Sequence, residues 1–261
     1  MSRVTVERTG PIATLWLDRA DKRNAMDDAM MKELAAAFDE LGGDRGVRVV
    51  VIAGRGPVFS SGIDHQLLAG AVGATARSPW LHVHHQLQDV MHRISRMQQP
   101  VIAALHGTCI GMALELALAV DLRIASEDCV LGLPEVAFGL VPDVGGTTRL
   151  VRAVGEPRAR DLVLTGRLVK ARTAERYGLV HDVAEDPMKR ALARAELLAA
   201  HPPAALGLAK VLCQAAGEID AATSFRLEGV VQQALIAKPE EMMKQFPAAL
   251  AFIKAQVAAA E

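Results

Sequence analysis

PVIAALHGTCIGMALELALAV, residues 100–120, is the most apolar stretch of the chain, and its internal breaks indicate how it folds. His106, Gly107 and Gly111 divide it into a strand-like run and a helix-forming run, and Glu115 stands inside the second run. Each of these four residues is unfavourable in hydrocarbon, for lack of a partner or of helix propensity. The stretch therefore predicts a buried strand followed by a buried helix rather than a membrane span.

The flanking sequence repeats this order of strand, loop and helix. Apolar runs at residues 47–53 and 122–125, each interrupted by one arginine, predict buried strands. Such strands are typical of a parallel sheet that is covered on both faces. Apolar residues recur at helical spacing over residues 27–43 and 81–97. Residues 4–17 predict a hairpin with its turn at a Gly-Pro pair. The pattern as a whole predicts an α/β fold.

The chain changes character in its second half. From about residue 155 onward the pattern is nearly all helical, with prolines between the segments. We predict an α/β core at residues 1–185 and a helical C-terminal region at residues 186–261. The helices within residues 171–260 carry more apolar surface than one short helical layer can bury. We therefore expect a homo-oligomer, either a trimer or a dimer of trimers.

Composition limits the classes of partner. The 261 residues are 51% hydrophobic and 23% charged, which is typical of a globular protein. The formal net charge of −1 offers no basic excess for nucleic acid. Three scattered cysteines (Cys109, Cys129 and Cys213) fit neither a disulfide framework nor a metal site. The N-terminal residues lack the apolar run of a signal peptide, so we expect a cytoplasmic protein.

Several known cofactor-binding, nucleophile and metal-binding motifs are incomplete in this sequence. A dinucleotide-binding fingerprint fails because Phe59 stands where its third glycine is needed, and a nucleophile elbow fails because Val58 replaces its first glycine. The histidines His82, His84 and His85 have no carboxylate or cysteine at ligand spacing. We predict no metal site there, and a solvated helix face or a subunit contact is the simpler interpretation of this cluster.

Glu115 is the most informative single residue, because only apolar side chains surround it in the sequence. Burial should raise its pKa. It is either a hydrogen-bonded structural carboxylate or a catalytic one, and the catalytic interpretation needs a second acid. Glu135 follows an apolar strand, and Asp143 comes eight residues later, before a Gly-Gly pair. Two such carboxylates can divide the work of general acid and general base.

Two glycine-marked places offer backbone donors for an oxyanion. Gly111 opens the predicted helix of Glu115, so the amide of Met112 is an orphan N–H at the positive end of a helix dipole. The loop of residues 60–64 contains Gly62, which lets backbone amides point into a pocket. An enolate oxygen fits between two such amides.

Three segments together carry a resemblance: residues 58–64 (VFSSGID), 106–116 (HGTCIGMALEL) and 133–147 (LPEVAFGLVPDVGGT). In order and spacing they resemble the enoyl-CoA hydratase/isomerase, or crotonase, family, and the similarity covers about residues 3–185. The resemblance implies a crotonase-like spiral of ββα units with a helical C-terminal trimerisation region. It also implies acyl-CoA thioester substrates and no cofactor, since coenzyme A is part of the substrate.

The resemblance also implies roles for individual residues. The N–H groups of Ile63 and Met112 correspond to the family's oxyanion hole, and Glu115 and Glu135 to its two hydratase glutamates. The early loop that passes the coenzyme's adenine and phosphates corresponds to the segment around Asn24. The predicted substrate-binding residues are Lys22, Arg23, Ala25, Ser61, Gly62, Asp64, His65 and Gly111.

Two departures from the family pattern leave the activity open. Met112 stands where relatives usually have glycine, and Asp143 stands where hydratases commonly have glycine and some isomerases have an acid. We expect an enoyl-CoA hydratase, in which Asp143 lies in the pocket wall or caps the next helix at Gly145 or Gly146. The alternatives are a 3-enoyl-CoA or 3,5-dienoyl-CoA isomerase that uses Asp143, and a non-catalytic acyl-CoA-binding member.

The acyl chain length is not fixed by these motifs. Residues 67–79 contain two glycines and show no clear period. We expect this segment to be irregular and to line the far end of the acyl pocket.

Overall fold

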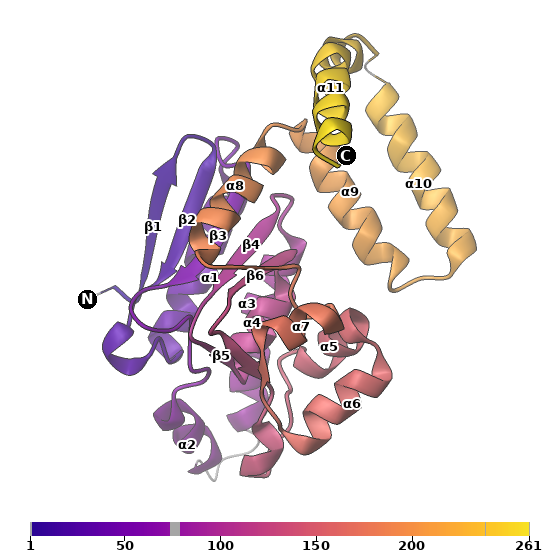
Figure 1. Cartoon of the computed structure of the whole chain (residues 1–261). Coiled ribbons are helices and arrows are strands. Elements are labelled where there is room, and N and C mark those ends of the chain that lie inside the picture. Colours follow the sequence, from indigo (N-terminus) through magenta and orange to yellow (C-terminus); the bar gives the residue numbers. More distant parts are fainter. Residues whose placement is uncertain (1, 74–78, 238, 261) are drawn as a thin grey trace. The chain divides into compact units, whose positions relative to one another are not determined.

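The computed structural model (Figure 1) describes residues 2–73, 79–237 and 239–260. The chain forms two compact units, residues 1–199 and 200–261. The division therefore falls later than the boundary expected after residue 185. The reason is α8 (Pro187–Ala199), which packs on the sheet of the first unit through its buried alanines and so belongs to the core.

Nine described strands form two sheets in the first unit. The larger sheet has the order β1-β2-β3-β4-β6-β9, in which β1 pairs antiparallel with β2 and the remaining pairs are parallel. Its strands are β1 (Val4–Thr9), β2 (Ile12–Leu17), β3 (Val49–Gly54), β4 (Val101–Leu105), β6 (Leu122–Ser126) and β9 (Asp182–Ala184). The smaller sheet consists of β5 (Thr108–Ile110), β7 (Val130–Gly132) and β8 (Val169–Lys170).

Helices follow the strands in the order that the sequence pattern predicts. The further helices of this unit are α1 (Asp28–Gly43), α2 (His65–Gly73), α3 (Pro79–Arg96), α4 (Met112–Ala119), α5 (Gly146–Val154), α6 (Glu156–Thr165) and α7 (Ala171–Tyr177). Two short 3₁₀ turns, η1 (Ala20–Lys22) and η2 (Glu135–Phe138), lie in the loops.

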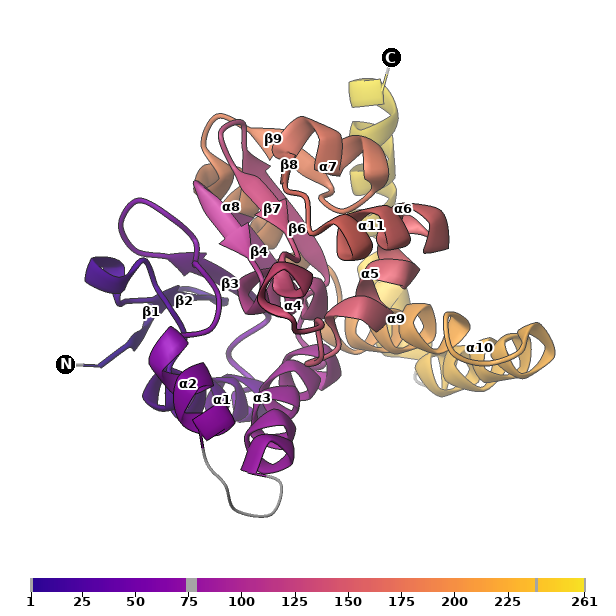
Figure 2. The same cartoon turned by 90° about the horizontal axis from the view of Figure 1, so that it is seen from below.

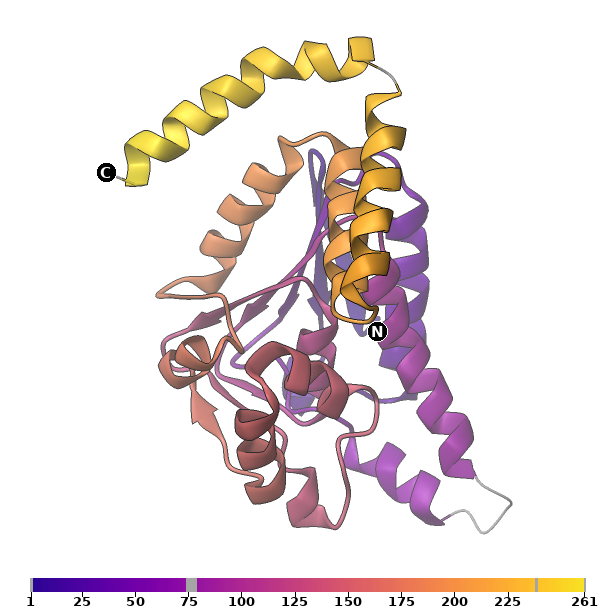
Figure 3. The same cartoon turned by 90° about the vertical axis from the view of Figure 1, so that its right-hand side faces the viewer.

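The inner strands β3 and β4 are buried on both faces of the larger sheet, as their apolar sequences require, whereas the edge strand β1 is largely exposed. Along β3, Val49 and Val51 belong to the apolar layer under α8, while Val50 and Ile52 belong to the layer that includes residues of α1, α3 and α4. Figure 3 shows α8 on one side of the sheet and α1 and α3 on the other. Successive side chains of a strand point to opposite faces, so one strand serves both layers.

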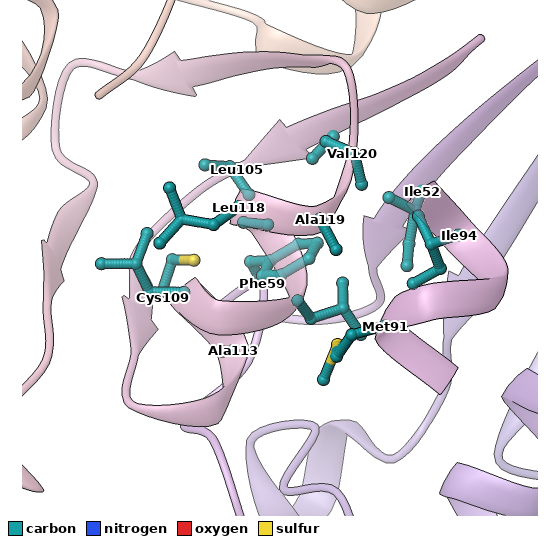
Figure 4. Packing of buried hydrophobic residues seen from close by; sticks show 14 of the residues in the cluster. Ile52, Phe59, Met91, Ile94, Leu105, Cys109, Ala113, Leu118, Ala119 and Val120 are labelled. Atoms are coloured by element: carbon teal, nitrogen blue, oxygen red, sulfur yellow. The ribbon is translucent and has the colours of Figure 1, made fainter. Parts of the chain in front are cut away.

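The helix α4 is buried along its whole length: all eight of its residues are buried, and none is more than 7% exposed. It lies between α3 and α5 (Figure 2), and Phe59, Cys109 and Met91 pack around it (Figure 4). The guanidinium of Arg123 donates to the carbonyl oxygen of Val120 at 3.0 Å and so satisfies the C-terminal end of the helix. Helix α4 is therefore held by packing along its sides and by a side-chain donor at its C-terminal end.

Most of the predicted elements are found, and two expectations are wrong. The predicted cap is confirmed, since the Asp27 side chain accepts from the amide of Met30 at the start of α1. The stretch after residue 155, expected to be helical, contains the short strands β8 and β9. Residues 67–79, expected to be irregular, are helical as far as Gly73 because leucine and alanine outweigh the glycines; residues 74–78 lie outside the described residues.

The second unit consists of helices. They are α9 (Pro203–Ala216), α10 (Ala221–Ile236) and α11 (Pro239–Ala260). Large apolar side chains on α10 and α11 are exposed in the single chain, including Phe225, Val230, Phe246 and Ile253. None of the helices within the described ranges is long and apolar enough to cross a membrane.

Candidate active site

A cavity of about 270 Å³ lies beside the first turn of α4. It brings together the three acids and the two oxyanion-hole residues that the sequence singled out, although they come from separate loops. Its lining consists of Ile63, Leu68, Leu87, Met112, Glu115, Glu135, Gly139, Leu140, Val141, Asp143 and Val144. The wall is therefore mainly apolar with a few convergent polar groups, which is typical of a small-molecule site.

The backbone at Ile63 is positioned by its neighbours. The amide of Met26 donates to the carbonyl of Gly62 at 2.8 Å, and the amide of Asp64 donates to the carbonyl of Met26 at 2.9 Å. This bridge leaves the N–H of Ile63 on the other edge of the chain. Gly62 has φ of 92°, and a Cβ there would lie 2.7 Å from a backbone oxygen of β5, so only glycine lets the two loops approach this closely.

The second amide belongs to the first residue of α4. Gly111 precedes this helix with φ of 57° and ψ of −133°, and its conformation turns the N–H of Met112 away from the helix. Within the part of the chain that the structure describes, neither this N–H nor that of Ile63 donates to a protein acceptor. Both residues line the same cavity, so their N–H groups are candidates for the two donors that an oxyanion hole requires.

Glu115 is held by backbone amides. Its Oε1 accepts from the N–H of Val144 at 3.1 Å and from that of Gly146 at 2.9 Å, and the residue is only 3% exposed. Burial raises the pKa of Glu115 to about 8, helped by the charges of Glu135 and Asp143 and opposed by the two amides. Since Oε1 accepts both hydrogen bonds, a proton on this carboxyl group resides on Oε2.

Glu135 is the first residue of η2 and is half-buried. Its Oε2 is shielded from solvent and has no hydrogen-bond partner among the described residues. Burial raises the pKa of Glu135; a hydrogen bond from its own backbone opposes this shift, and the charge of Asp143 adds to it. A Cβ at Gly111 would lie 3.1 Å from Oε1 of Glu135, so this carboxyl group lies beside the start of α4.

Asp143 lies in the wall of the same cavity, where it lines the site together with both glutamates. Its Oδ2 is 3.8 Å from Nε2 of His84. The alternative expectation of a helix cap is wrong for Gly146, because that amide donates to Glu115. The first of the two expected positions, the pocket wall, is the one found.

The histidine cluster divides between two environments. His84 approaches the Asp143 backbone, whereas the neighbouring His85 is exposed, and the side chain of His82 lies outside the described residues. Among the described residues there is no group of three potential metal ligands.

The loop of residues 22–25, which is expected to contact coenzyme A, lies against the loop of residues 60–64, here called the oxyanion loop. Asn24 is fully buried, and its Nδ2 donates to the carbonyl oxygens of Val58 at 2.9 Å and Phe59 at 3.1 Å. The amide of Ser61 donates to the carbonyl of Arg23 at 3.0 Å. Arg23 and Asn24 both have φ of 53°, a conformation that the hydrogen bonds of Asn24 stabilise.

The predicted substrate-binding side chains differ in accessibility. Lys22 and Arg23 are exposed, and Ala25 and Ser61 are half-buried. None of the eight predicted substrate-binding residues is part of the cavity lining. Exposed cations at this loop can attract an anionic group of a ligand, although Nη2 of Arg23 also donates to the hydroxyl of Thr108 at 3.4 Å.

Asp64 and His65 are not brought to the cavity. The Asp64 carboxylate accepts from Nη1 of Arg19 at 2.6 Å and from the amide of Gln66 at 2.8 Å. Burial opposes its ionisation, but these donors outweigh burial and hold the pKa of Asp64 below its ordinary value. The ring of His65 is exposed. Asp64 therefore serves to fix the loop and to cap α2 rather than to face the cavity.

The sequence did not identify the groups that hold Glu115. The amides of Val144 and Gly146 carry no side-chain signal, and only the Gly-Gly pair marks their position. Gly146 is required there, since a Cβ would lie 2.4 Å from Oε1 of Glu115. Arg149 was also missed; its Nη1 donates to the carbonyl of Val144 at 3.2 Å, and burial lowers its pKa against the opposing charge of Glu115.

Comparison with known proteins identifies the class and then the family. A Bacillus anthracis enoyl-CoA hydratase structure superposes with a TM-score of 0.88 at 30% identity, over 95% of this chain and 96% of that one. The fold is therefore the crotonase fold. The model of the enoyl-CoA hydratase/isomerase family matches residues 7–252. The chain belongs to the enoyl-CoA hydratase/isomerase family.

Two proteins of similar sequence are both named as hydratases of enoyl-CoA thioesters. A Thermus thermophilus protein provisionally named enoyl-CoA hydratase is 38% identical over 226 residues, covering 86% of this chain and 88% of the relative. The 2,3-dehydroadipyl-CoA hydratase of Escherichia coli is 33% identical over 226 residues, covering 84% of each.

Proposed function

We propose that this chain is an enoyl-CoA hydratase that catalyses the reversible syn addition of water to a trans-2-enoyl-CoA thioester. The observation that carries the proposal is that Glu115, Glu135, Ile63 and Met112 line one cavity. Two carboxyl groups and two amide donors are the groups that this reaction needs. The names of the similar proteins support the same activity.

The two amides would act on the thioester oxygen. When water adds to the β-carbon, the electrons of the double bond move toward the thioester and place negative charge on its oxygen. The N–H groups of Ile63 and Met112 would stabilise that enolate, with help from the positive end of α4. Removing one donor of such a pair costs about 10²- to 10³-fold in rate.

The two carboxyl groups would share the proton transfers. One glutamate accepts a proton from the water molecule while the water oxygen bonds to the β-carbon, and the other glutamate gives a proton to the α-carbon. This division requires one protonated and one ionised carboxyl group. The pKa of Glu115, raised to about 8, and the raised pKa of Glu135 favour a pair that shares a proton near neutral pH.

The substrate would bind as its coenzyme A thioester. The exposed side chains of Lys22 and Arg23, beside the oxyanion loop, fit the phosphates of the coenzyme. Leu68 and Leu87 are apolar and fit the acyl chain. We propose that no separate cofactor takes part, since the enolate is stabilised by amides, and that the protein works in the cytoplasm.

A second candidate is a double-bond isomerase, which Asp143 favours because it lines the same cavity and its charge raises the pKa of both glutamates. A carboxylate would take a proton from C2 of a 3-enoyl-CoA, and a carboxylic acid would return one at C4. No water would be added in that reaction. A 3,5-dienoyl-CoA would react in the same way over a longer distance.

The experiment that separates the candidates assays the wild type and Asp143→Asn on trans-2-enoyl-CoA and on 3-enoyl-CoA thioesters of several chain lengths. A hydratase adds water to the first substrate class and keeps most of that rate in Asp143→Asn. Double-bond migration that is lost in Asp143→Asn would make the isomerase correct. Binding of both thioesters without turnover would overturn both and leave an acyl-CoA-binding protein.

We also propose that the chain assembles as a trimer or a dimer of trimers. The exposed apolar residues of α10 and α11 support this, because soluble monomers rarely expose so many large apolar side chains on neighbouring turns. Light scattering at micromolar concentration is expected to give three or six times the chain mass. A monomer mass would contradict the proposal.

A further inference from the structure

Two side chains from one face of α3 meet the backbone of the loop that holds Glu115. Nε2 of His84 lies 2.8 Å from the carbonyl oxygen of Asp143, and Nε2 of Gln88 donates to the same oxygen at 3.1 Å. The two residues are four positions apart, so they lie on the same face of the helix. A carbonyl oxygen is thus held by two donors from an element distant in sequence.

The hydrogen on the His84 ring can be placed from its neighbours. Nε2 faces the carbonyl oxygen of Asp143 and, at 3.8 Å, the carboxylate of the same residue, and both are acceptors. Nε2 therefore carries the hydrogen. Nδ1 is buried and has no partner among the described residues, so the hydrogen bonding of this ring is directed at Asp143.

The carbonyl in question belongs to the peptide that donates to Glu115. The C=O of Asp143 and the N–H of Val144 are two ends of one peptide unit, and this N–H donates to Oε1 of Glu115 at 3.1 Å. The described chain has no cis peptide, so the two groups point in opposite directions. His84 and Gln88 lie on one side of that peptide and Glu115 on the other.

We infer that His84 is a positioning residue for Glu115, acting with Gln88 through the peptide between Asp143 and Val144. By holding the carbonyl, the two side chains fix the plane in which the N–H points at the carboxylate. A hydrogen bond to the carbonyl also polarises the peptide and strengthens donation from its N–H. The inference rests on the proposed function for its effect on catalysis, but its structural part concerns this chain alone.

Other charges face Glu115 and must stay constant in a test. Glu135 faces it from η2, Asp143 from the loop before α5, and Arg149 from α5. All three residues are kept when His84 is replaced, and among them the Asp143 carboxylate is the one that His84 approaches, at 3.8 Å. The Val144 amide lowers the pKa of Glu115, so loss of its alignment should raise that pKa.

The test compares His84→Leu, which removes the donor, with His84→Gln, whose side-chain amide places a donor near the position of Nε2. His85→Leu is the matched control, because His85 is the next residue on the helix and is exposed. Two quantities are measured: the pH dependence of kcat and KM with a short trans-2-enoyl-CoA, and the titration of the Glu115 carboxyl by carbon-13 NMR, assigned with Glu115→Gln.

We expect His84→Leu to lower kcat by on the order of 10- to 100-fold with little change in KM, because the carboxyl group is misplaced rather than the substrate. The titration of Glu115 should move to higher pH. His84→Gln should restore both quantities, and His85→Leu should match the wild type. Gln88→Leu should change kcat and the Glu115 titration in the same direction by a smaller amount. It replaces His84→Leu in the test if that variant does not fold.

A kcat and a Glu115 titration unchanged in His84→Leu would overturn the inference, as would a failure of His84→Gln to rescue a folded protein. If the wild type hydrates no enoyl-CoA, the proposed function fails by itself. The NMR titration then still decides whether His84 acts on Glu115.

Discussion

Glu115 and Glu135 line one cavity, but the regions that carry them are built in opposite ways. Glu115 stands on α4, whose eight residues are all buried, and two amides hold its Oε1. Glu135 begins η2, which has no buried residue; its last side chain, Phe138, is exposed, and so is Val141 in the loop that follows. One acid is fixed by the core, and the other lies at its margin.

This difference shows how a fold can give two identical side chains separate properties. Burial raises the pKa of Glu115 to about 8, and its orientation is set by the 144–146 backbone. Glu135 is less buried, and its Oε2 has no protein partner in the described part of the chain. We expect Glu115 to be sensitive to changes in the scaffold and Glu135 to changes in the ligand.

The largest expected effect is the loss of hydration when either acid is replaced. Glu115→Gln and Glu135→Gln should each lower kcat by about 10²- to 10⁴-fold, the usual range for general acid–base groups. The double variant should be little worse than the worse single one, because the two groups act as a unit. Near-normal turnover in both single variants, measured by the absorbance of the conjugated thioester, would refute the shared role.

The next effect is on stability and separates the two acids. The folded state raises the pKa of Glu115 from an ordinary value of 4.5 to about 8. The contribution of this carboxyl group to the free energy of unfolding is therefore fully present below pH 4.5 and is lost as the pH rises toward 8. Glu115→Gln lacks this loss. Its unfolding free energy relative to the wild type should rise by about 1.4 kcal/mol per pH unit over that window.

Urea unfolding at several pH values between 4.5 and 9 measures this difference. Glu135→Gln is the matched comparison, and its difference from the wild type should grow less steeply because Glu135 is less buried. Equal slopes for the two variants would show that the two regions do not differ as described.

A smaller effect is expected from a change in the scaffold alone. Gly146→Ala places a Cβ 2.4 Å from Oε1 of Glu115, which must move and lose its amide donors. We expect on the order of a 100-fold loss in kcat, since small displacements of catalytic groups are costly. Gly42→Ala is the control, because a Cβ there meets nothing within 4 Å. Full activity in Gly146→Ala would show that the Glu115 position is not critical.

The sequence predicted the parts of this molecule that rest on local patterns. Asp27 predicts the start of α1, and the apolar run before His106 predicts β4. The isolated carboxylate of Glu115 predicts the position of the candidate site. These features depend on propensity, periodicity and local composition, which a single sequence carries. The pairing of Ile63 with Met112 came instead from the resemblance to the family.

What the sequence did not predict depends on distant contacts. The strand β9 has three residues and exists because it pairs with β6, far away in the chain. The donors to Glu115 are backbone amides of Val144 and Gly146, and a backbone amide is the same in every sequence. The meeting of His84 with Asp143 spans 59 positions and is decided by the packing of α3.

The most direct test of the proposed chemistry follows the oxygen atom of water. The wild type is incubated with a short trans-2-enoyl-CoA in water enriched in oxygen-18. The masses of the thioester products are then measured by mass spectrometry. We predict a 3-hydroxyacyl-CoA that carries one heavy oxygen atom, formed far more slowly by Glu135→Gln. Recovery of the enoyl-CoA unchanged, or of a positional isomer without heavy oxygen, would contradict the account.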